Sequence, residues 1–245
     1  APRCFEVERR LRELLDIPVF HDDQHGTAIV VLAALRNALK LVKKDISDCK
    51  IIINGVGAAG TAIARLLMLS GAKNIIGFDS KGSITKERVS NDPMRQWFLD
   101  NCNPNQFSGT LSECMVSTDI FIGVSAPNVL KESDVASMAK DSIVFALANP
   151  DPEIDPVIAR KYAAVVATGR SDQPNQINNV LAFPGIFRGL LDAGAHKITD
   201  AMLVATAEAI ASCVSSEQLN ASFIVPSVFD PNVVKEVAAA VKRSC

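Results

Sequence analysis

The sequence is poor in aromatic residues and has no concentrated block of charge. Its 245 residues include one Trp and one Tyr, and 25 Lys and Arg residues are balanced by 27 Asp and Glu residues, for a formal net charge of −2. Even the arginine cluster at residues 9–12 lies among glutamates, a pattern typical of a solvated helix face. Nucleic-acid binding needs a basic surface, and this composition argues against one.

Cysteine motifs and long hydrophobic runs are also missing. The six cysteines are scattered with no CxxC pair, which argues against disulfides and a zinc ribbon and predicts reduced thiols. Arg36 and Lys40 interrupt the longest apolar stretch, so we expect no membrane span of ~18 residues. The start, APRCFEVERR, has neither a signal-peptide nor a transit-peptide pattern. We expect a cytoplasmic protein, with an organelle matrix as the alternative, and, because the chain begins without Met, a fragment or a processed product.

What the sequence does contain is a series of short apolar runs that alternate with helical patterns. The runs are KIIIN (50–54), NIIGFD (74–79), DIFIGV (119–124), SIVFAL (142–147) and AVVAT (164–168). Apolar runs of this length, separated by helices, are typical of parallel strands that are covered on both faces. The sequence therefore predicts an α/β fold, a Rossmann-like doubly wound parallel sheet.

Helical patterns precede and follow this alternating region. FEVERRLRELLD and residues 27–43 have helical spacing, and the second is apolar almost all round, which predicts burial on more than one side. Residues 180–245 contain helical patterns and no convincing strand, and the last helix begins at Asp230. We expect residues 1–45 to form N-terminal helices and a loop, and residues 180–245 to add C-terminal helices.

The stretch FHDDQHGTA (20–28) imitates a zinc site. His21 and His25 lie four residues apart, as in the HExxH helix of zinc proteases. The run IPVF (17–20) reads as a strand, however, and the helix is expected to begin only after His25. The zinc site would lack its helix, so two adjacent aspartates at the end of a strand become the informative feature.

A glycine motif follows the strand KIIIN directly. Gly55-Val56-Gly57-Ala58-Ala59-Gly60 leads into the helical segment TAIARLLMLSGA, and strand, glycines and helix in this order predict a dinucleotide site. Gly55 permits the tight turn, Gly57 lets the backbone approach a pyrophosphate, and Gly60 allows close helix packing. The pyrophosphate would rest on the helix amino end, where free amides favour anions.

The residues after this motif bear on the choice of dinucleotide. Asp79 ends the next strand about 20 residues past Gly60, as expected of the acid that binds the adenosine ribose. A carboxylate there repels a 2′-phosphate and favours NAD, but Ser80 and Lys81 suit a phosphate, so the preference over NADP is slight. The loop GVSAPNVL (123–130) lines the nicotinamide side or is simply a strand-to-helix connection.

Three polar clusters fall at the expected carboxyl ends of strands, where open α/β sheets bind ligands. They are HDDQHGT, ANPDPE (148–153) and SDQPNQINN (171–179). Asn149, Asn178 and Asn179 offer donors and acceptors for a carboxylate, a hydroxyl or the nicotinamide amide. Asparagine is equally a turn residue, above all in Asn149-Pro150. Spacing alone leaves both readings open.

Seven collinear motifs together carry a family resemblance. They are IPVFHDDQHGTA, INGVGAAGTAIARLL, FDSKG, IGVSAPNVL, FALANPDPEI, TGRSDQPNQINNVLAFPGIFRG and IVPSVFDPNVVKEVAAAV. In these motifs the chain resembles the NAD(P)-binding domain of the short, bacterial-type malic enzymes from residue 17 to about residue 242. The resemblance implies oxidative decarboxylation of malate to pyruvate and CO₂, with NAD or NADP and with Mn²⁺ or Mg²⁺.

The resemblance also implies roles for particular residues. Asp23 is then a carboxylate ligand of the divalent metal, which prefers oxygen to imidazole, and Asp22 is a catalytic residue beside the position of the family's lysine. Substrate would be held by Asn149 and by Asn178 or Asn179. The dinucleotide would contact Gly55, Gly57, Ala58, Ala59, Gly60, Asp79, Ser125 and Asn149.

The chain departs from the family pattern at its start. A Glu-Asp pair that supplies further metal ligands should stand just before Ala1, and the catalytic tyrosine and lysine belong to an upstream domain. The single tyrosine, Tyr162, is expected to be structural. We therefore expect these 245 residues alone to bind cofactor weakly and not to turn over malate.

Several alternatives stay open at this point. Malolactic enzyme would convert malate to lactate without net cofactor reduction, and a non-catalytic NAD-binding module would sense NAD, although it would not need Asp23. A parent protein with an acyltransferase-like domain after residue 245 is also compatible with the sequence. We expect partners to be malate and pyruvate, the upstream domain and a second copy in a homo-oligomer, a dimer, but neither nucleic acid nor membrane.

Overall fold

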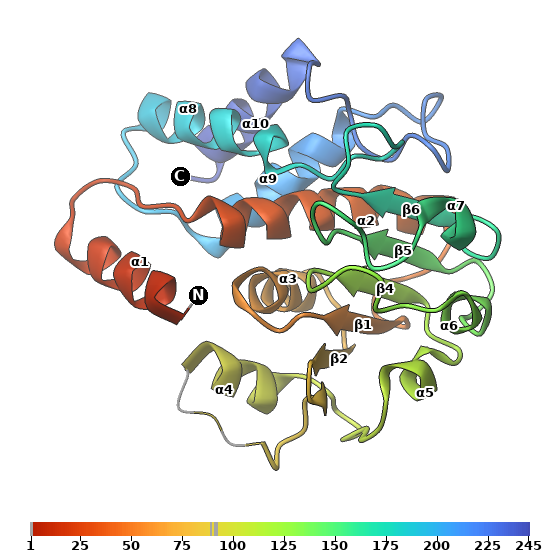
Figure 1. The fold of residues 1–245 in the computed structure, drawn as a ribbon. Coiled ribbons are helices and arrows are strands. Elements are labelled where there is room, and N and C mark those ends of the chain that lie inside the picture. Colours follow the sequence, from red (N-terminus) through yellow and green to blue (C-terminus); the bar gives the residue numbers. More distant parts are fainter. Residues whose placement is uncertain (1, 89, 91–92) are drawn as a thin grey trace.

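The computed structural model describes residues 2–88, 90 and 93–245 of the chain (Figure 1). Its helices are α1 (Pro2–Leu14), a π-helical turn η1 (Asp22–Gly26), α2 (Thr27–Val42), α3 (Ala58–Leu69), α4 (Pro93–Asn101), α5 (Leu111–Met115), α6 (Glu132–Ala136), α7 (Pro156–Ala159), a 3₁₀ turn η2 (Asn179–Leu181), α8 (Phe183–Ala193), α9 (Asp200–Ser212) and α10 (Pro231–Arg243). Its strands are β1 (Lys50–Asn54), β2 (Asn74–Asp79), β3 (Gly82–Ser83), β4 (Ile120–Gly123), β5 (Ile143–Ala146) and β6 (Val165–Thr168).

The strands form one sheet in the order β3-β2-β1-β4-β5-β6. All neighbours are parallel except β3, which pairs antiparallel with β2 at the edge. The five predicted strands and the Rossmann-like class are confirmed, while the two-residue strand β3 was not predicted. The order reverses between β1 and β4, so the carboxyl ends of these strands frame the crevice in which such sheets bind ligands.

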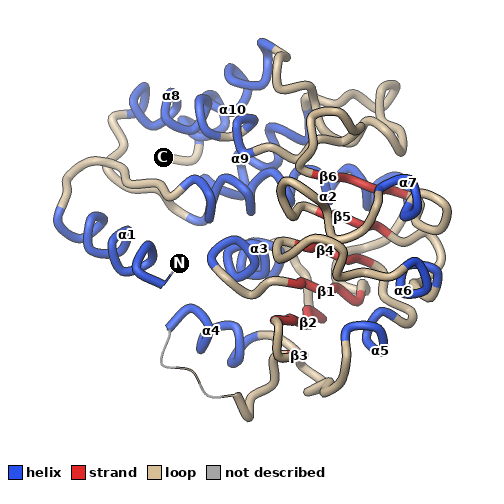
Figure 2. The backbone as a smooth tube through the Cα atoms, in the orientation of Figure 1, coloured by secondary structure: helices blue, strands red, loops and turns tan. Residues whose placement is uncertain are grey.

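Helices cover both faces of this sheet, as Figure 2 shows in a view along its edge. Side chains of β1 alternate: Ile51 and Ile53 enter the core beneath α2, α3 and α9, whereas Ile52 enters the smaller core beneath α5, α6 and α7. Because each strand is buried on both faces, its sequence is continuously apolar instead of alternating. That is the physical reason why the strands could be found from the sequence.

Helix α2 lies at the centre of the larger core. Together with η1 it forms a 21-residue helical stretch, Asp22–Val42, with mean hydropathy 1.3, long and apolar enough by composition to cross a bilayer. The expectation that Arg36 and Lys40 rule out such a segment was therefore wrong. Of the apolar 18-residue window in this stretch, 67% is buried inside the protein, and Asn37 donates hydrogen bonds to the Ala211 and Ile224 carbonyls at 2.9 Å. These contacts make α2 a packed core helix.

Two local predictions at the start of α2 were wrong. Residues 17–20 form no strand. Pro18 lacks an amide hydrogen to donate to a neighbouring strand, and the Phe20 ring packs edge-on against Phe187 with 6.0 Å between the ring centroids. The helix was also expected to begin after His25, but helical structure already begins at Asp22 in η1. Gly26 has right-handed helical angles (φ −61°, ψ −47°) and joins η1 to α2 without a break. The paired aspartates therefore stand on a helical turn and not on a strand end.

The C-terminal helices fold back on α2. Helix α9 packs along α2, and α10 packs on α8 and α9, as the blue end of the chain in Figure 1 shows. Asp230 caps α10 by accepting a hydrogen bond from the Asn232 amide at 2.9 Å, with Pro231 in the first turn as its sequence predicts. Helix α9 therefore covers apolar surface of α2, and α10 packs in turn on α8 and α9.

Three of the six cysteines, Cys49, Cys102 and Cys114, are buried in the core. Burial raises the pKa of Cys49 and Cys114 to about 11 and that of Cys102 to about 12. All three stay protonated near neutral pH. The six cysteines form no disulfide among the described residues, in agreement with the prediction of reduced thiols.

Helix α1 is tied to η1 by one buried carboxylate. Glu8, only 8% exposed, lies 2.7 Å from His25 Nε2 and 2.7 Å from the Arg12 guanidinium. Burial by itself would raise the pKa of Glu8, but the hydrogen bond and charge of His25 and the charge of Arg12 outweigh it and lower the pKa. The ionised form of Glu8 thus holds α1 against the turn that carries the paired aspartates.

We expect Glu8→Gln to destabilise the protein most at neutral pH and least in acid. A hydrogen bond to a charged group contributes about 1–3 kcal/mol, and each kcal/mol is about 2–4 °C in the melting temperature of a domain of this size. Since the folded pKa lies below the ordinary value of 4.5, the contribution is complete above that value and is lost as the pH falls through the folded pKa. Melting curves recorded between about pH 7 and pH 3 test this. Glu6→Gln, on the exposed side of α1, is the control, and a pH-independent difference would contradict the expectation.

Candidate functional site

A cavity of about 370 Å³ opens at the carboxyl ends of the strands. It is lined by Asp23, Thr27, Ala59, Val124, Ser125, Leu147, Ala148, Asn149, Gly169, Ile177, Asn178 and Asn179. The fold thus brings together residues from all three polar clusters, the glycine turn and the loop after β4. Of the predicted site residues, the cavity wall includes Asp23, Ala59, Ser125, Asn149, Asn178 and Asn179.

The glycine turn has the geometry that its sequence predicts. Gly55 has φ +108°, and a Cβ there would lie 2.6 Å from the Val124 carbonyl oxygen. A Cβ on Gly60 would collide with the Gly55 carbonyl, so α3 can approach β1 only with glycine at that position. A Cβ on Gly57 would meet nothing within 4 Å, which leaves open space beside the first amides of α3. Glycine is therefore needed at each position for a different reason. Gly55 makes the turn, Gly57 leaves space that a ligand can approach, and Gly60 allows close packing of α3 on the turn.

The second and third glycines of this set, Gly57 and Gly60, give a matched pair of variants. Gly57→Ala is expected to leave the melting temperature within about 2 °C of wild type and to weaken dinucleotide binding by about 10-fold or more, because the methyl group fills the space a pyrophosphate needs. Gly60→Ala is expected to lower the melting temperature, because its Cβ overlaps backbone. Thermal melting and NAD titration separate the two effects. Unchanged NAD affinity in Gly57→Ala would contradict the assignment.

Asp79 ends β2 in an unexpectedly basic setting. Its carboxylate accepts hydrogen bonds from Arg88 at 2.8 and 3.0 Å, from Arg95 and from the Lys81 amide at 2.8 Å. Burial opposes ionisation, yet the Arg88, Lys81 and Arg95 hydrogen bonds prevail and lower the pKa of Asp79. Neither arginine was predicted: Arg88 follows β3 and Arg95 lies on α4, and no sequence pattern connects them with Asp79.

The two aspartates of η1, Asp22 and Asp23, lie in different surroundings: Asp22 contacts Asn179 and Asp23 lines the cavity. Asp22 accepts a hydrogen bond from the Asn179 side-chain amide, and its other oxygen, Oδ1, is buried with no hydrogen-bond partner among the described residues. Burial and then the charge of Asp23 raise the pKa of Asp22. Asp23 is exposed and lines the cavity. One carboxyl is thus held inside the protein, while its neighbour faces the space where a ligand would sit.

The asparagines are held by their own turns. Asn178 caps η2 by accepting a hydrogen bond from the Val180 amide at 3.0 Å, and Asn149 precedes Pro150 through a cis peptide bond. Both side chains still line the cavity. The turn reading and the ligand reading of these residues are therefore compatible.

The residues present fit only part of a metal site. Within residues 2–88, 90 and 93–245, no three His, Cys, Asp or Glu side chains converge as metal ligands. The zinc arrangement is also absent here, since His25 is bonded to Glu8 through Nε2. Asp23 offers one exposed carboxylate beside amide oxygens, a donor set that suits a hydrated Mg²⁺ or Mn²⁺. The chain can thus supply one anionic ligand to such an ion.

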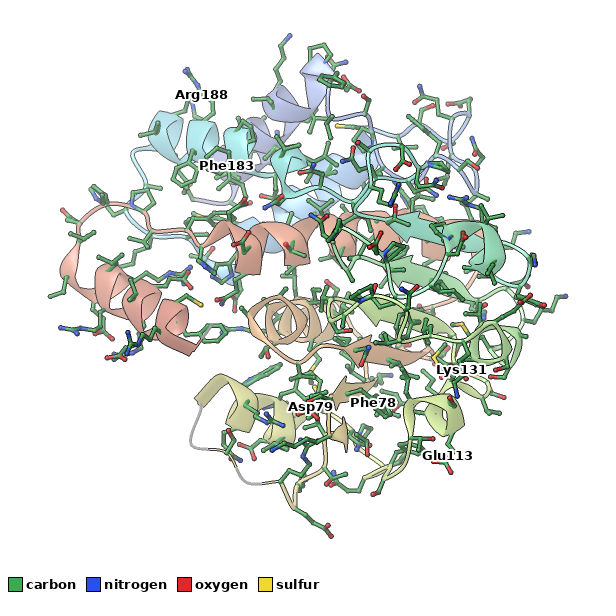
Figure 3. The ribbon with its side chains drawn as sticks, viewed as in Figure 1. Phe78, Asp79, Glu113, Lys131, Phe183 and Arg188 are labelled. Atoms are coloured by element: carbon green, nitrogen blue, oxygen red, sulfur yellow. The ribbon has the colours of Figure 1, made fainter. Side chains whose placement is uncertain are left out.

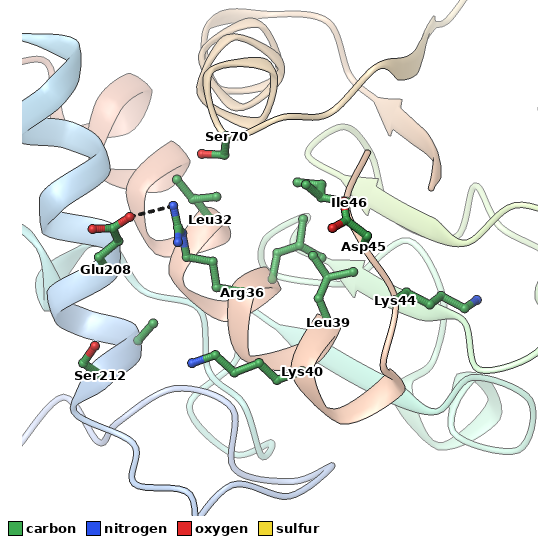
Figure 4. Close-up of a pocket in the computed structure, with 12 residues that line it drawn as sticks. Leu32, Arg36, Leu39, Lys40, Lys44, Asp45, Ile46, Ser70, Glu208 and Ser212 are labelled. Atoms are coloured by element: carbon green, nitrogen blue, oxygen red, sulfur yellow. Dashed lines mark ion pairs between the residues drawn. The ribbon is translucent and has the colours of Figure 1, made fainter. Parts of the chain in front are cut away.

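A second hollow, of about 440 Å³, lies at the far end of α2 between α9 and residues 44–46 (Figure 4). Its basic side chains already have partners: Arg36 pairs with Glu208 at 2.9 Å, Lys40 with Asn37 at 3.2 Å and Lys44 with Asp119 at 2.8 Å. None of the predicted site residues lines it. The cavity at the carboxyl ends is therefore the candidate site.

The parallel sheet, the glycine turn at the amino end of α3 and the acid at the end of β2 define a Rossmann-type dinucleotide-binding domain. The sequence model of the family "Malic enzyme, NAD binding domain" matches residues 24–245. The chain belongs to the malic enzyme family.

Relatives and solved structures agree with this assignment. The chain is 55% identical to an NAD-dependent malic enzyme of Geobacillus stearothermophilus over 98% of its own length and 50% of that protein. It is 50% identical to a bifunctional malic/malolactic enzyme of Bacillus subtilis over 100% of its own length and 60% of that protein. The crystal structure of Entamoeba histolytica malic enzyme superposes with a TM-score of 0.94 at 42% identity, covering 99% of this chain and 52% of that one. The chain therefore spans about half the length of these relatives.

Proposed function

We propose that the polypeptide containing this chain oxidises and decarboxylates malate to pyruvate and CO₂ with NAD or NADP, and that this chain supplies the dinucleotide site and part of the substrate and metal site. The observation that supports it best is the cavity itself. Asp23, Ser125, Asn149, Asn178 and Asn179 line it beside the glycine turn, in a chain similar to malic enzymes over its whole length.

Each part of the cavity has a task in this reaction. The free amides at the start of α3 bind the pyrophosphate, and Ser125 lies on the wall next to the nicotinamide. The amides of Asn149 and of Asn178 or Asn179 bind the carboxylate and hydroxyl oxygens of malate and orient its C2 hydrogen toward the cofactor. Asp22, fixed by Asn179, is the catalytic carboxyl of this chain and orients a lysine from the rest of the polypeptide.

A divalent ion, Mn²⁺ or Mg²⁺, completes the proposed site with Asp23 as its ligand from this chain. When bound, it supplies Lewis-acid stabilisation of charge that develops on the substrate oxygens. Asp23 faces the cavity and Asp22 does not line it, which agrees with giving the ligand role to Asp23.

The direct test measures the near-ultraviolet absorbance of reduced nicotinamide. The full polypeptide is given malate and Mn²⁺ with NAD or NADP in separate cuvettes. A malate- and metal-dependent rise is expected, faster with NAD. The isolated 245 residues are expected to bind cofactor weakly and to give no rise, because their described residues bring no three metal-ligating side chains together. No rise from the full polypeptide with either cofactor would contradict the proposal.

Malolactic chemistry is the second candidate, because a bifunctional malic/malolactic enzyme is 50% identical to the chain. In that reaction the bound dinucleotide is reduced and reoxidised, so lactate forms without net absorbance change. Measuring lactate and pyruvate in the same samples distinguishes the two reactions. Lactate as the sole product would make this candidate the function.

We also infer self-association of the parent protein, a homodimer, in the cytoplasm. Apolar side chains on α8 support it: Phe183 is 47% exposed and Leu191 74% exposed, and Figure 3 shows Phe183 and Arg188 on this outer helix. Exposed apolar patches of this kind mark interaction surfaces. Light scattering of the full polypeptide tests the dimer.

A further inference from the structure

Glu153 is a fully buried carboxylate that the sequence did not single out. It is 0% exposed and lies behind the cavity wall, between the loop after β4 and the loop after β5. One carboxylate oxygen accepts a hydrogen bond from the Ser125 amide at 3.1 Å, and the other accepts from the Ala148 amide at 3.0 Å. Both donors belong to residues that line the cavity. One side chain therefore holds two walls of the candidate site.

The main chain around Glu153 strengthens this link. Its carbonyl accepts a hydrogen bond from the Leu130 amide at 3.0 Å, and the Pro152 carbonyl accepts from the Asn128 amide at 3.1 Å. A Cβ on Gly123, the last residue of β4, would collide with the Glu153 side chain. The end of β4 is thus shaped to admit this carboxylate.

Ser125 is fixed from a second direction as well. The Asn54 side chain, at the end of β1, donates a hydrogen bond to Ser125 Oγ at 2.8 Å. Glu153 holds the Ser125 main chain while Asn54 holds its hydroxyl, so the carboxyl ends of three neighbouring strands are connected through these contacts. Asn149 follows directly after Ala148, so the hydrogen bond from the Ala148 amide to Glu153 also helps to fix the position of Asn149.

We propose that Glu153 is a positioning residue, which sets the distance between the cofactor wall at Ser125 and the substrate wall at Asn149 through its hydrogen bonds to the Ser125 and Ala148 amides. The inference rests on the proposed function of the cavity. A carboxylate suits the task because each of its two oxygens accepts from one amide, whereas a glutamine turns an NH₂ group toward one of these donors. Burial raises the pKa of Glu153, and the two amide hydrogen bonds oppose that rise.

Burying a carboxylate lowers the free energy of unfolding unless its hydrogen bonds compensate, because its desolvation opposes folding. Residues of similar size without charge would stabilise the core at least as well. Precise spacing of reacting groups gives a different reason to retain it, because a displacement of about 1 Å at an active site reduces the rate by up to about 100-fold.

The test compares Glu153→Gln and Glu153→Asp with Asp134→Asn in the full polypeptide. Asp134 is also a buried carboxylate that accepts a main-chain hydrogen bond, from the Lys131 amide at 2.9 Å, but it lies on α6 outside the cavity. We expect Glu153→Gln to lower kcat/KM for malate about 10–100-fold and to raise KM for both malate and NAD. Asp134→Asn is expected to change the melting temperature by about as much as Glu153→Gln does. It should leave the KM values for malate and NAD at the wild-type level.

The outcomes separate this inference from the proposed function. Kinetic constants of Glu153→Gln equal to those of Asp134→Asn would overturn it. If wild type lacks malate activity, the proposed function fails, and NAD titration then decides about Glu153: weaker binding in Glu153→Gln supports its role, and equal binding overturns it. If Glu153→Gln does not fold, Glu153→Asp is judged by the same measurements. If neither folds while Asp134→Asn does, Glu153 serves the fold and the inference is wrong.

Discussion

Replacing Asp79 with alanine in the full polypeptide is expected to shift cofactor preference from NAD to NADP. The ratio of kcat/KM for NADP to that for NAD should rise by about 100-fold or more. Steady-state rates with each dinucleotide at saturating malate measure this ratio. The expectation follows from the position of Asp79 at the end of β2, where a Rossmann-type domain binds the adenosine ribose.

The size of the shift comes from the two arginines on Asp79. The lowered pKa keeps Asp79 ionised near neutral pH, so its charge repels a 2′-phosphate while it accepts hydrogen bonds from Arg88 and Arg95. Removing the carboxylate ends the repulsion and frees two guanidinium groups. Guanidinium binds phosphate with paired, charge-assisted hydrogen bonds. A loss for NAD is therefore combined with a gain for NADP.

Two further variants make the result specific. Asp79→Ala combined with Arg88→Ala should lose most of the NADP gain and keep the NAD loss. Asp100→Ala, on the exposed side of the same helix α4 that carries Arg95, should leave the ratio unchanged. If Asp79→Ala lowers activity equally with both cofactors, Asp79 does not discriminate between them and the arginines do not receive a phosphate.

The sheet could be predicted from the sequence because its parallel strands are short, continuous apolar runs. Each of the five parallel strands is buried on both faces, so the three consecutive isoleucines of KIIIN and all of IVFA are apolar. IPVF has the same composition but no neighbouring strand, and Phe20 finds its partner in Phe187 instead. IPVF is also less buried than the strands, with Ile17 61% exposed, so an apolar composition alone does not establish a buried strand.

The candidate site was predictable only where a local motif carries it. Gly55 makes the turn through its own φ of +108°, and Gly60 packs on the carbonyl of Gly55 five residues earlier, so their spacing is informative. Arg88 and Glu153 act on residues 9 and 28 positions away, at Asp79 and Ser125, and nothing in their immediate sequence signals it. The resemblance gave Asp22 and Asp23 different roles, but nothing in their local spacing shows that Asp22 bonds to Asn179 while Asp23 lines the cavity.

Asp23→Ala is expected to have the largest effect on malate turnover. We expect kcat/KM for malate in the full polypeptide to fall by about 1000-fold or more, because losing a metal carboxylate removes several kcal/mol of charge stabilisation. NAD binding should be unchanged, since Asp23 lies on η1 and not on the glycine turn. Mn²⁺ titration by electron paramagnetic resonance should show weaker binding. The exposed Asp16→Ala is the control, because the Asp16 side chain is 94% exposed and pairs with His196 on the protein surface.

The neighbouring variant Asp22→Asn distinguishes the two aspartates. It keeps the shape of the side chain beside Asn179 but removes the carboxyl that the proposal treats as catalytic. We expect it to retain Mn²⁺ affinity within about 3-fold of wild type while its kcat falls, the opposite pattern to Asp23→Ala. If Asp23→Ala keeps full Mn²⁺ affinity and Asp22→Asn loses it, the ligand is Asp22, and the inward orientation of that carboxyl must change when the rest of the polypeptide is present.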